Sequence, residues 1–144
     1  MTGDAAEIAR ASADAMWAED KASRALGMKI EKVEPGLAVL SMSVVPSMVN
    51  GHGLCHGGYI FMLADSTMAF ASSSRGQRTL AQFCQISYVA PGRLGMRLAA
   101  DARERHRGER SGIYDVTVRS EAGETIAEFR GQTRSIPGAL IPDA

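Results

Sequence analysis

The sequence predicts a single α+β domain in which one antiparallel sheet wraps around a long central helix, with another helix at the N-terminus. Three observations support this prediction. Residues 57–74 contain only one charged side chain, Asp65, and a helix that is apolar on most of its faces is buried. Two strand-like segments precede this helix and four follow it. Because the edge of a flat sheet cannot cover such a helix, we expect the sheet to curl around it.

The composition fits one intracellular domain. The chain has 144 residues, 45% of them hydrophobic, which suits a single domain spanning 1–144. Its 16 basic and 16 acidic side chains cancel, so no overall charge draws it to nucleic acid or to a membrane surface. No apolar stretch reaches the ~20 residues that cross a bilayer, and the N-terminus lacks a secretory signal pattern. We therefore expect a cytoplasmic protein without a disulfide scaffold.

The N-terminal segment, residues 1–27, is expected to be helical. It is alanine-rich from about Ala5 to Leu26, and Gly27 is a suitable C-terminal stop. Strands over 28–33 and 37–45 follow, and the Pro-Gly turn between them indicates a hairpin.

Beyond the central helix, which Arg75 and Gly76 are expected to end, the chain reads as an antiparallel meander. Glycine-containing turns separate its four strand-like stretches, 78–89, 94–107, 111–120 and 125–135. The tail 137–144 is expected to be flexible. A helix wrapped by a sheet in this way is the hotdog arrangement.

The start of the central helix, Gly57, is our candidate for an oxyanion donor. The N-terminus of a helix presents unpaired N–H groups and the positive end of the helix dipole. A thioester oxygen that becomes negative during attack would be stabilised there. The alternative is that Gly57 and Gly58 merely permit a tight turn into the helix.

The isolated acid, Asp65, is our candidate for the reacting carboxylate. It lies eight residues beyond Gly57, about 12 Å along a helix, so one substrate carbonyl cannot touch both. If the two act together, Asp65 approaches the Gly57 end of a second copy, across a two-fold axis between antiparallel helices. The alternative is that Asp65 accepts from a backbone or serine donor, with Ser66 and Thr67 adjacent.

The loop before the helix offers polar side chains but no convincing metal site. In His-x2-Cys-His, adjacent ligands point to opposite sides and no second Cys/His pair completes a tetrahedron. Cys55 is expected to be a packed thiol rather than a nucleophile. His56 and Asn50 are candidates to hydrogen-bond the substrate carbonyl, and the alternative for both is helix capping and loop bonding.

Three arginines recur at alternate positions of one predicted strand. Arg103, Arg105 and Arg107 would point to one face, and such a basic cluster suits the phosphates of coenzyme A. The alternative is a solvated edge strand whose charges discourage aggregation.

The motif from Asn50 through His56-Gly57-Gly58 to Asp65 closely resembles the PaaI-type branch of the hotdog acyl-CoA thioesterases. Pro91-Gly92 and the stretches 112–115 and 129–131 are also similar to that branch. The resemblance implies hydrolysis of a CoA thioester, with aryl-acetyl or similar aromatic acyl groups as the leading substrate class in phenylacetate degradation.

By position, the resemblance implies that Asp65 activates water or attacks directly and that the Gly57 N–H binds the oxyanion. Asn50 and His56 would hold the substrate from the other subunit, near Gly58. A hydroxyl that some relatives carry after the helix is absent here, so its role is vacant or falls to Gln82.

The family also implies a dimer of dimers and no cofactor, because coenzyme A is part of the substrate. Acyl selectivity would depend on the depth of a pocket set by Tyr59, Met62, Met68 and Phe83. Two alternatives stay open, a hotdog acyl-CoA hydratase or dehydratase and a non-catalytic acyl-CoA-binding module.

Overall fold

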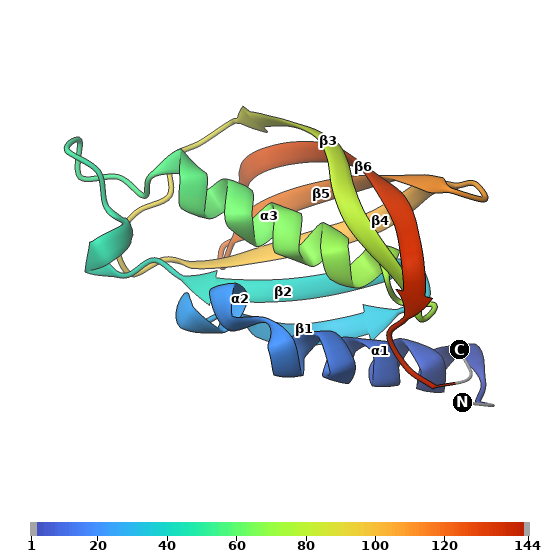
Figure 1. Cartoon of the computed structure of the whole chain (residues 1–144). Helices are drawn as coiled ribbons and strands as arrows, with labels where there is room; N and C mark the ends of the chain where they lie inside the picture. Colours follow the sequence, from blue (N-terminus) through green and yellow to red (C-terminus); the bar gives the residue numbers. More distant parts are fainter. Residues whose placement is uncertain (1–2, 143–144) are drawn as a thin grey trace.

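A computed structural model, which describes residues 3–142, contains one six-stranded sheet curled around a central helix (Figure 1). This confirms the predicted hotdog architecture. Among the described residues, no helix is long and apolar enough to cross a membrane. In chain order the elements are α1 (Ala5–Glu19), α2 (Lys21–Ala25), β1 (Lys29–Glu34), β2 (Leu37–Ser43), η1 (Pro46–Met48), α3 (Gly57–Ser72), β3 (Gln77–Tyr88), β4 (Arg97–Arg107), β5 (Ser111–Ser120) and β6 (Thr125–Ala139).

The strand order, β1-β2-β4-β5-β6-β3, corrects one part of the prediction. All neighbours are antiparallel, but β3 pairs with β6 and not with β4, so only β4, β5 and β6 form a meander. The reason lies in the wrapping, because α3 crosses the concave face between β2 and β3 (Figure 1). The chain therefore leaves the helix at the far edge of the sheet, and β4 returns to pair with β2.

The central helix α3 packs against all six strands and α2. Phe70 is 1% exposed and its ring lies 6.2 Å from the ring of Trp17 in α1, while Phe61 meets Phe129 of β6 edge-on. Burial of this apolar surface is the main driving force for the fold. The helix ends at Ser72 instead of continuing to residue 74. Its fully or nearly buried members are Ile60, Leu63, Ala64, Thr67, Met68, Phe70, Ala71 and Ser72.

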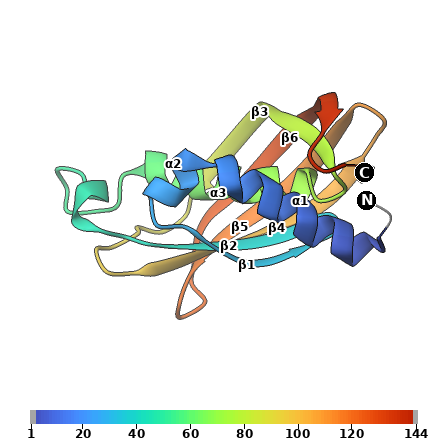
Figure 2. The ribbon, with the colours of Figure 1, turned by 60° about the horizontal axis from the view of Figure 1, so that its bottom comes forward.

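The N-terminal segment is two helices instead of one. Asp20 leaves the helical conformation, and its side chain accepts a hydrogen bond of 2.9 Å from the Ser23 N–H, which caps α2. Gly27 has a φ of +70° and ends α2 as predicted. Figure 2 shows α1 along the β1 side of the molecule, where the two elements are in contact.

The C-terminal segment departs from the predicted flexible tail 137–144. Strand β6 continues to Ala139, which pairs with Gln77, and Ile141 is only 6% exposed. The extension exists because β3 begins at Gln77 and offers its edge to this part of β6. Residues 143–144 of the predicted tail lie outside the described residues.

Strand β4 begins at Arg97 and not at Leu94, which is 56% exposed.

Candidate active site

The N-terminus of α3 presents one free backbone donor. The Gly58 N–H donates to Nδ1 of His56 at 2.8 Å, and the Tyr59 N–H donates to the carbonyl oxygen of His56 at 3.0 Å. The Gly57 N–H has no acceptor within the described part of the chain. The positive end of the helix dipole therefore coincides with an unoccupied N–H at the residue that the sequence singled out.

His56 is the N-cap of α3, so the capping alternative is realised for this residue. Because Nδ1 accepts from the Gly58 N–H, neutral His56 carries its proton on Nε2. The ring is exposed and lies edge-on to Tyr59, with 6.3 Å between ring centres. Capping uses only Nδ1, so the Nε2–H of His56 has no acceptor among residues 3–142 and stays available as a donor.

Asn50 organises the loop before the helix. Its Oδ1 accepts from the N–H groups of His52 and Leu54 at 2.9 and 3.2 Å. The loop-bonding alternative is thus realised by the oxygen, while Nδ2 has no acceptor among residues 3–142. Asn50 lines the cavity at the start of α3, so this amide remains a possible donor to a ligand.

The backbone conformation does not require glycine at residues 57 and 58. Gly53 has a φ of +76°, the left-handed region that favours glycine, but neither Gly57 nor Gly58 has a positive φ. A left-handed backbone therefore does not explain glycine at these two positions. Their missing side chains make room for close neighbours instead, because an added Cβ would lie 2.9 Å from Tyr88 at Gly57 and 3.0 Å from His56 at Gly58.

Tyr88, at the end of β3, is a residue of this region that the sequence analysis missed. Its hydroxyl donates to the carbonyl oxygen of Gly57 at 2.9 Å. The two residues are 31 positions apart, and no local pattern pointed to their contact. The only signal was an aromatic residue at a strand end next to a Pro-Gly turn.

A cavity of about 450 Å³ opens at this end of α3. Two of the loops that line this cavity lie close together. The Cys55 N–H of one loop donates to the Gly92 carbonyl of the other at 2.8 Å, and a Cβ on Gly92 would lie 3.1 Å from Cβ of Cys55. Asp65 is not among the lining residues, so one subunit alone does not bring acid and amide together. The lining consists of Asn50, Leu54, Cys55, Gly57, Ile60, Tyr88, Val89, Ala90, Pro91 and Gly92.

Asp65 is half-buried on α3 and makes no hydrogen bond or ion pair with any residue that the structure describes. Burial raises the pKa of its carboxyl group above the usual value for aspartate. The neighbouring hydroxyls are committed elsewhere, Ser66 to Ser23 at 2.8 Å and Thr67 to the Leu63 carbonyl at 2.6 Å. The alternative that Asp65 satisfies a local donor is therefore wrong, and the carboxylate is available for another group.

Both thiols are poor nucleophiles. Cys55 is buried, as predicted for a packed thiol, and burial raises its pKa. The pKa of Cys84 is raised by burial and, to a lesser extent, by the negative charge of Asp65. Among the described residues, no group of three or more His, Cys, Asp and Glu side chains is placed to hold a metal ion.

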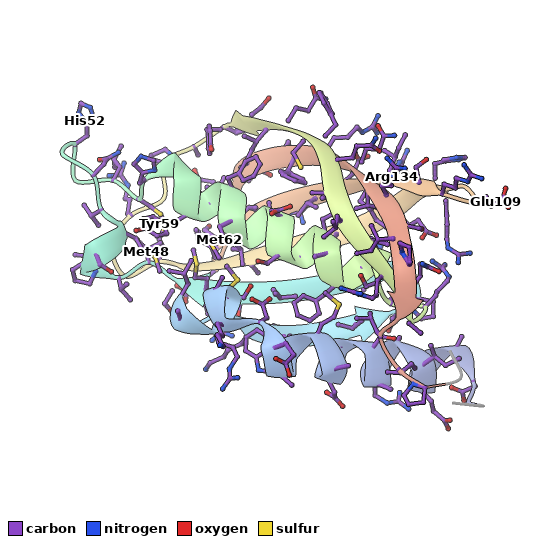
Figure 3. The ribbon with its side chains drawn as sticks, in the orientation of Figure 1. Met48, His52, Tyr59, Met62, Glu109 and Arg134 are labelled. Carbon is purple, nitrogen blue, oxygen red and sulfur yellow. The ribbon has the colours of Figure 1, made fainter. Side chains whose placement is uncertain are left out.

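The residues expected to set the depth of an acyl pocket separate in the structure. Tyr59 and Met62 follow one another near the start of α3 and are partly buried (Figure 3). Met68 is 1% exposed within the core, whereas Phe83 is 59% exposed on β3. Gln82 is the bulged residue between two paired positions of β3 and is exposed. Only Tyr59 and Met62 therefore combine partial burial with a position near Gly57.

The arginine cluster does not exist as predicted. A bulge at Arg105 shifts the register of β4, so Arg107 pairs with Gly112 on the face of Tyr114, while Arg103 pairs with Asp115 on the opposite face. Arg103 and Arg105 are engaged by carboxylates, Asp101 at 3.2 Å and Asp115 at 3.3 Å. The three side chains do not share a face, so the prediction that they form one basic cluster on one face of the strand is wrong.

Comparison with known proteins adds three findings. A family model described as the thioesterase superfamily matches residues 52–127. Acyl-coenzyme A thioesterase PaaI of Escherichia coli is 39% identical over 133 residues, which cover 92% of this chain and 95% of the relative. The solved structure of E. coli PaaI, from the phenylacetic acid degradation operon, matches with a TM-score of 0.93 and 38% identity over 94% of this chain and 99% of that one.

A more distant match carries a ligand. A Streptococcus mutans protein solved with bound acetyl-CoA has a TM-score of 0.74 and 29% identity, covering 76% of this chain and 88% of that one. The likeness in fold thus extends to a protein whose ligand is a CoA thioester.

Proposed function

The chain belongs to the thioesterase superfamily, and from this premise we propose that it hydrolyses acyl-CoA thioesters at a site shared between two subunits. The acyl-CoA thioesterase activity follows from the relatives named above. The observation that carries the shared site is a pair of unsatisfied groups on one helix, the Gly57 N–H and the Asp65 carboxylate. About 12 Å of helix separates them, so a substrate carbonyl held by one is out of reach of the other within a subunit.

A homodimer would resolve this separation. Two α3 helices running antiparallel across a two-fold axis would bring Asp65 of each copy to the Gly57 end of the other. Strand β3 supports such an interface, since it is a 12-residue edge strand on which Leu80 and Phe83 are each 59% exposed. A long apolar edge is unusual on a monomer because it invites pairing with another chain. A dimer of dimers is the further assembly we propose.

The proposed reaction needs no metal or redox cofactor. The thioester carbonyl oxygen sits at the Gly57 N–H, where the helix dipole stabilises the negative charge that develops on attack. The Nε2–H of His56 and the Nδ2 of Asn50 are further donors at the same end. Asp65 from the other subunit either accepts a proton from the attacking water or attacks the carbonyl carbon itself, and the thiolate of coenzyme A leaves as the tetrahedral intermediate collapses. In the first case the carboxylic acid forms directly, and in the second case water hydrolyses the acyl–aspartyl anhydride and restores Asp65.

His56 favours hydrolysis over the hydratase alternative. A hydratase would use a histidine with a carboxylate to move a proton at carbon, which requires an imidazole nitrogen free to accept. Here Nδ1 is occupied by the Gly58 N–H and Nε2 carries the proton, so neutral His56 is a donor. We propose aryl-acetyl groups as the preferred acyl class, on the strength of the relative from the phenylacetic acid degradation operon.

The test is a panel of acyl-CoA esters assayed by release of free thiol, with wild type and Asp65→Asn. Thiol release separates hydrolysis from hydration, which leaves the thioester intact. We expect Asp65→Asn to lower kcat by about a thousandfold or more while binding of coenzyme A esters is kept.

Asp14→Asn makes the same chemical change on the exposed face of α1 and is expected to retain wild-type turnover. Full turnover in Asp65→Asn would exclude the role assigned to this acid. Absence of thiol release by the wild type with every ester would contradict the proposed activity itself.

A further inference from the structure

We propose that Tyr88 and His56 clamp the peptide unit between Gly57 and Gly58 and thereby fix the direction in which the Gly57 N–H points. Both are positioning residues in this role, and the inference rests on the proposed function of that N–H. The clamp explains why a tyrosine from the edge strand reaches the first turn of the central helix.

The two side chains hold opposite ends of the same peptide. The Tyr88 hydroxyl donates to the carbonyl oxygen of Gly57 at 2.9 Å, and Nδ1 of His56 accepts from the N–H of Gly58 at 2.8 Å. That carbonyl and that N–H belong to one planar unit, so its orientation is fixed from both sides. Tyr88 belongs to β3, and His56 is the N-cap of α3.

The preceding peptide is held as well. Its carbonyl oxygen, that of His56, accepts from the Tyr59 N–H at 3.0 Å. Its N–H is that of Gly57, the group without an acceptor among the described residues. With the peptides on both sides of Gly57 held, the free N–H has a fixed direction before substrate arrives. Preorganised donors of this kind are the most effective stabilisers of a developing oxyanion, because they need no reorganisation during the reaction.

The glycine pair fits this clamp. A Cβ on Gly57 would lie 2.9 Å from Cζ of Tyr88, and a Cβ on Gly58 would lie 3.0 Å from Nδ1 of His56. Each glycine thus leaves room for one of the two clamping side chains. Neither has a positive φ, so backbone conformation does not require glycine at these positions.

Packing in the core of a single subunit does not account for Tyr88. Its side chain is 51% exposed at the end of the edge strand, so it adds little to the apolar core. Tyr88 also lines the cavity at Gly57, so its ring contacts both this cavity and the start of the helix.

Tyr88→Phe is the direct test, because it keeps the ring and removes the hydroxyl. We expect kcat for an acyl-CoA ester to fall about 10-fold with KM within about twofold of wild type, since the lost bond acts on the transition state. Hydrogen exchange of the Gly58 amide, measured by NMR on the free enzyme, is expected to accelerate about fivefold or more.

Tyr114→Phe is a matched control. It also removes a hydrogen-bonded tyrosine hydroxyl, the one that donates to Glu104 at 2.9 Å, but at the opposite end of α3. We expect it to lower the melting temperature while kcat and the relative exchange rate of Gly58 stay at wild-type values.

A double-mutant cycle tests the close approach separately. Gly57→Ala is expected to lower kcat in the wild-type background, because its Cβ collides with the Tyr88 ring. In a Tyr88→Ala background the additional loss caused by Gly57→Ala is expected to be small. Equal losses in both backgrounds would contradict the contact.

The outcomes distinguish the clamp from the activity. An active wild type together with unchanged kcat and unchanged Gly58 exchange in Tyr88→Phe would overturn the clamp and leave the proposed function standing. An inactive wild type would overturn the proposed function, whereas Gly58 exchange in Tyr88→Phe would still decide whether the peptide is clamped.

Discussion

The two ends of the central helix α3 are built in opposite ways. At its start, Gly57 lines a cavity of about 450 Å³, and its N–H has no acceptor among residues 3–142. At its end, the carbonyl oxygens of Ala69 and Ala71 accept hydrogen bonds from the residues that follow. The contrast teaches that the two ends of one helix can have different roles. The N-terminal end offers a donor to the ligand, and the C-terminal end attaches the helix to the sheet and stabilises the fold.

Serine hydroxyls and an ion pair hold the C-terminal end of α3 in place. The Ser74 hydroxyl donates to the Ala71 carbonyl at 2.7 Å and accepts from the Gly36 N–H at 2.8 Å. Arg75 forms a two-pronged bond with Glu104 of β4, at 2.6 and 3.1 Å. The hydrogen bonds from Arg75 and Tyr114 hold the pKa of Glu104 below its usual value despite partial burial.

Removing the ion pair should have the largest effect on stability. Glu104→Ala leaves Arg75 without its partner and the Tyr114 hydroxyl without its acceptor, so we expect a loss of about 3 kcal/mol in the free energy of unfolding. At a temperature where the variant is folded, kcat should stay within about twofold of wild type. Denaturant unfolding and a thiol-release assay check the two expectations.

Glu109→Ala, in the exposed turn between β4 and β5, is the control and should change neither quantity (Figure 3). If Glu104→Ala lost activity without losing stability, the assignment of the C-terminal end of α3 to stability and of its N-terminal end to catalysis would be wrong.

Truncating the N-cap should show the converse pattern. His56→Ala removes the Nε2–H donor and the bond to the Gly58 N–H, and we expect kcat to fall about 50-fold. The cost in stability should be about 1 kcal/mol, the usual value for losing a helix cap. Steady-state kinetics and denaturant unfolding of the same preparation give both numbers.

His52→Ala is matched to it, because His52 lies at the tip of the same loop and points away from the helix (Figure 3). This control should keep wild-type kcat. A loss confined to stability in His56→Ala would place His56 with the structural end of the helix.

The smallest expected effect on stability concerns Asp65, which lies between the two ends of α3. Burial raises its pKa in the folded state, so ionised Asp65 lowers stability above that pKa, and the penalty vanishes as pH falls toward the unfolded value of about 3.9. Asp65→Asn should therefore melt a few degrees higher than wild type at pH 7, and the difference should shrink as the pH is lowered. Thermal melts across pH check the sign, and a variant less stable than wild type at pH 7 would contradict an unpartnered acid.

The ionisation of Asp65 should also determine how kcat/KM falls at low pH. Because Asp65 acts ionised and burial raises its pKa, kcat/KM should begin to fall at a higher pH than an exposed aspartate would give. A pH profile of kcat/KM measures this limb directly.

The sequence predicted what depends on local pattern. The start of the helix at Gly57, the strand 111–120 and the isolated acid at residue 65 all follow from periodicity and composition. Contacts between distant residues were beyond its reach, including the pairing of β3 with β6 and the bond from Tyr88 to Gly57. The bulge at Arg105 shows the same limit, since alternation predicts one face and the register of the neighbouring strand decides otherwise.

Subunit mixing tests the central claim most directly. Asp65→Asn and His56→Ala each disable both sites of a homodimer, but a mixed dimer has one site with both changes and one with neither. After the two inactive variants are unfolded together and refolded in equal amounts, half of the dimers are mixed, so activity should recover to about a quarter of wild type. Activity that stays at the sum of the two parent variants would contradict a site built by Asp65 of one subunit and the Gly57 end of another.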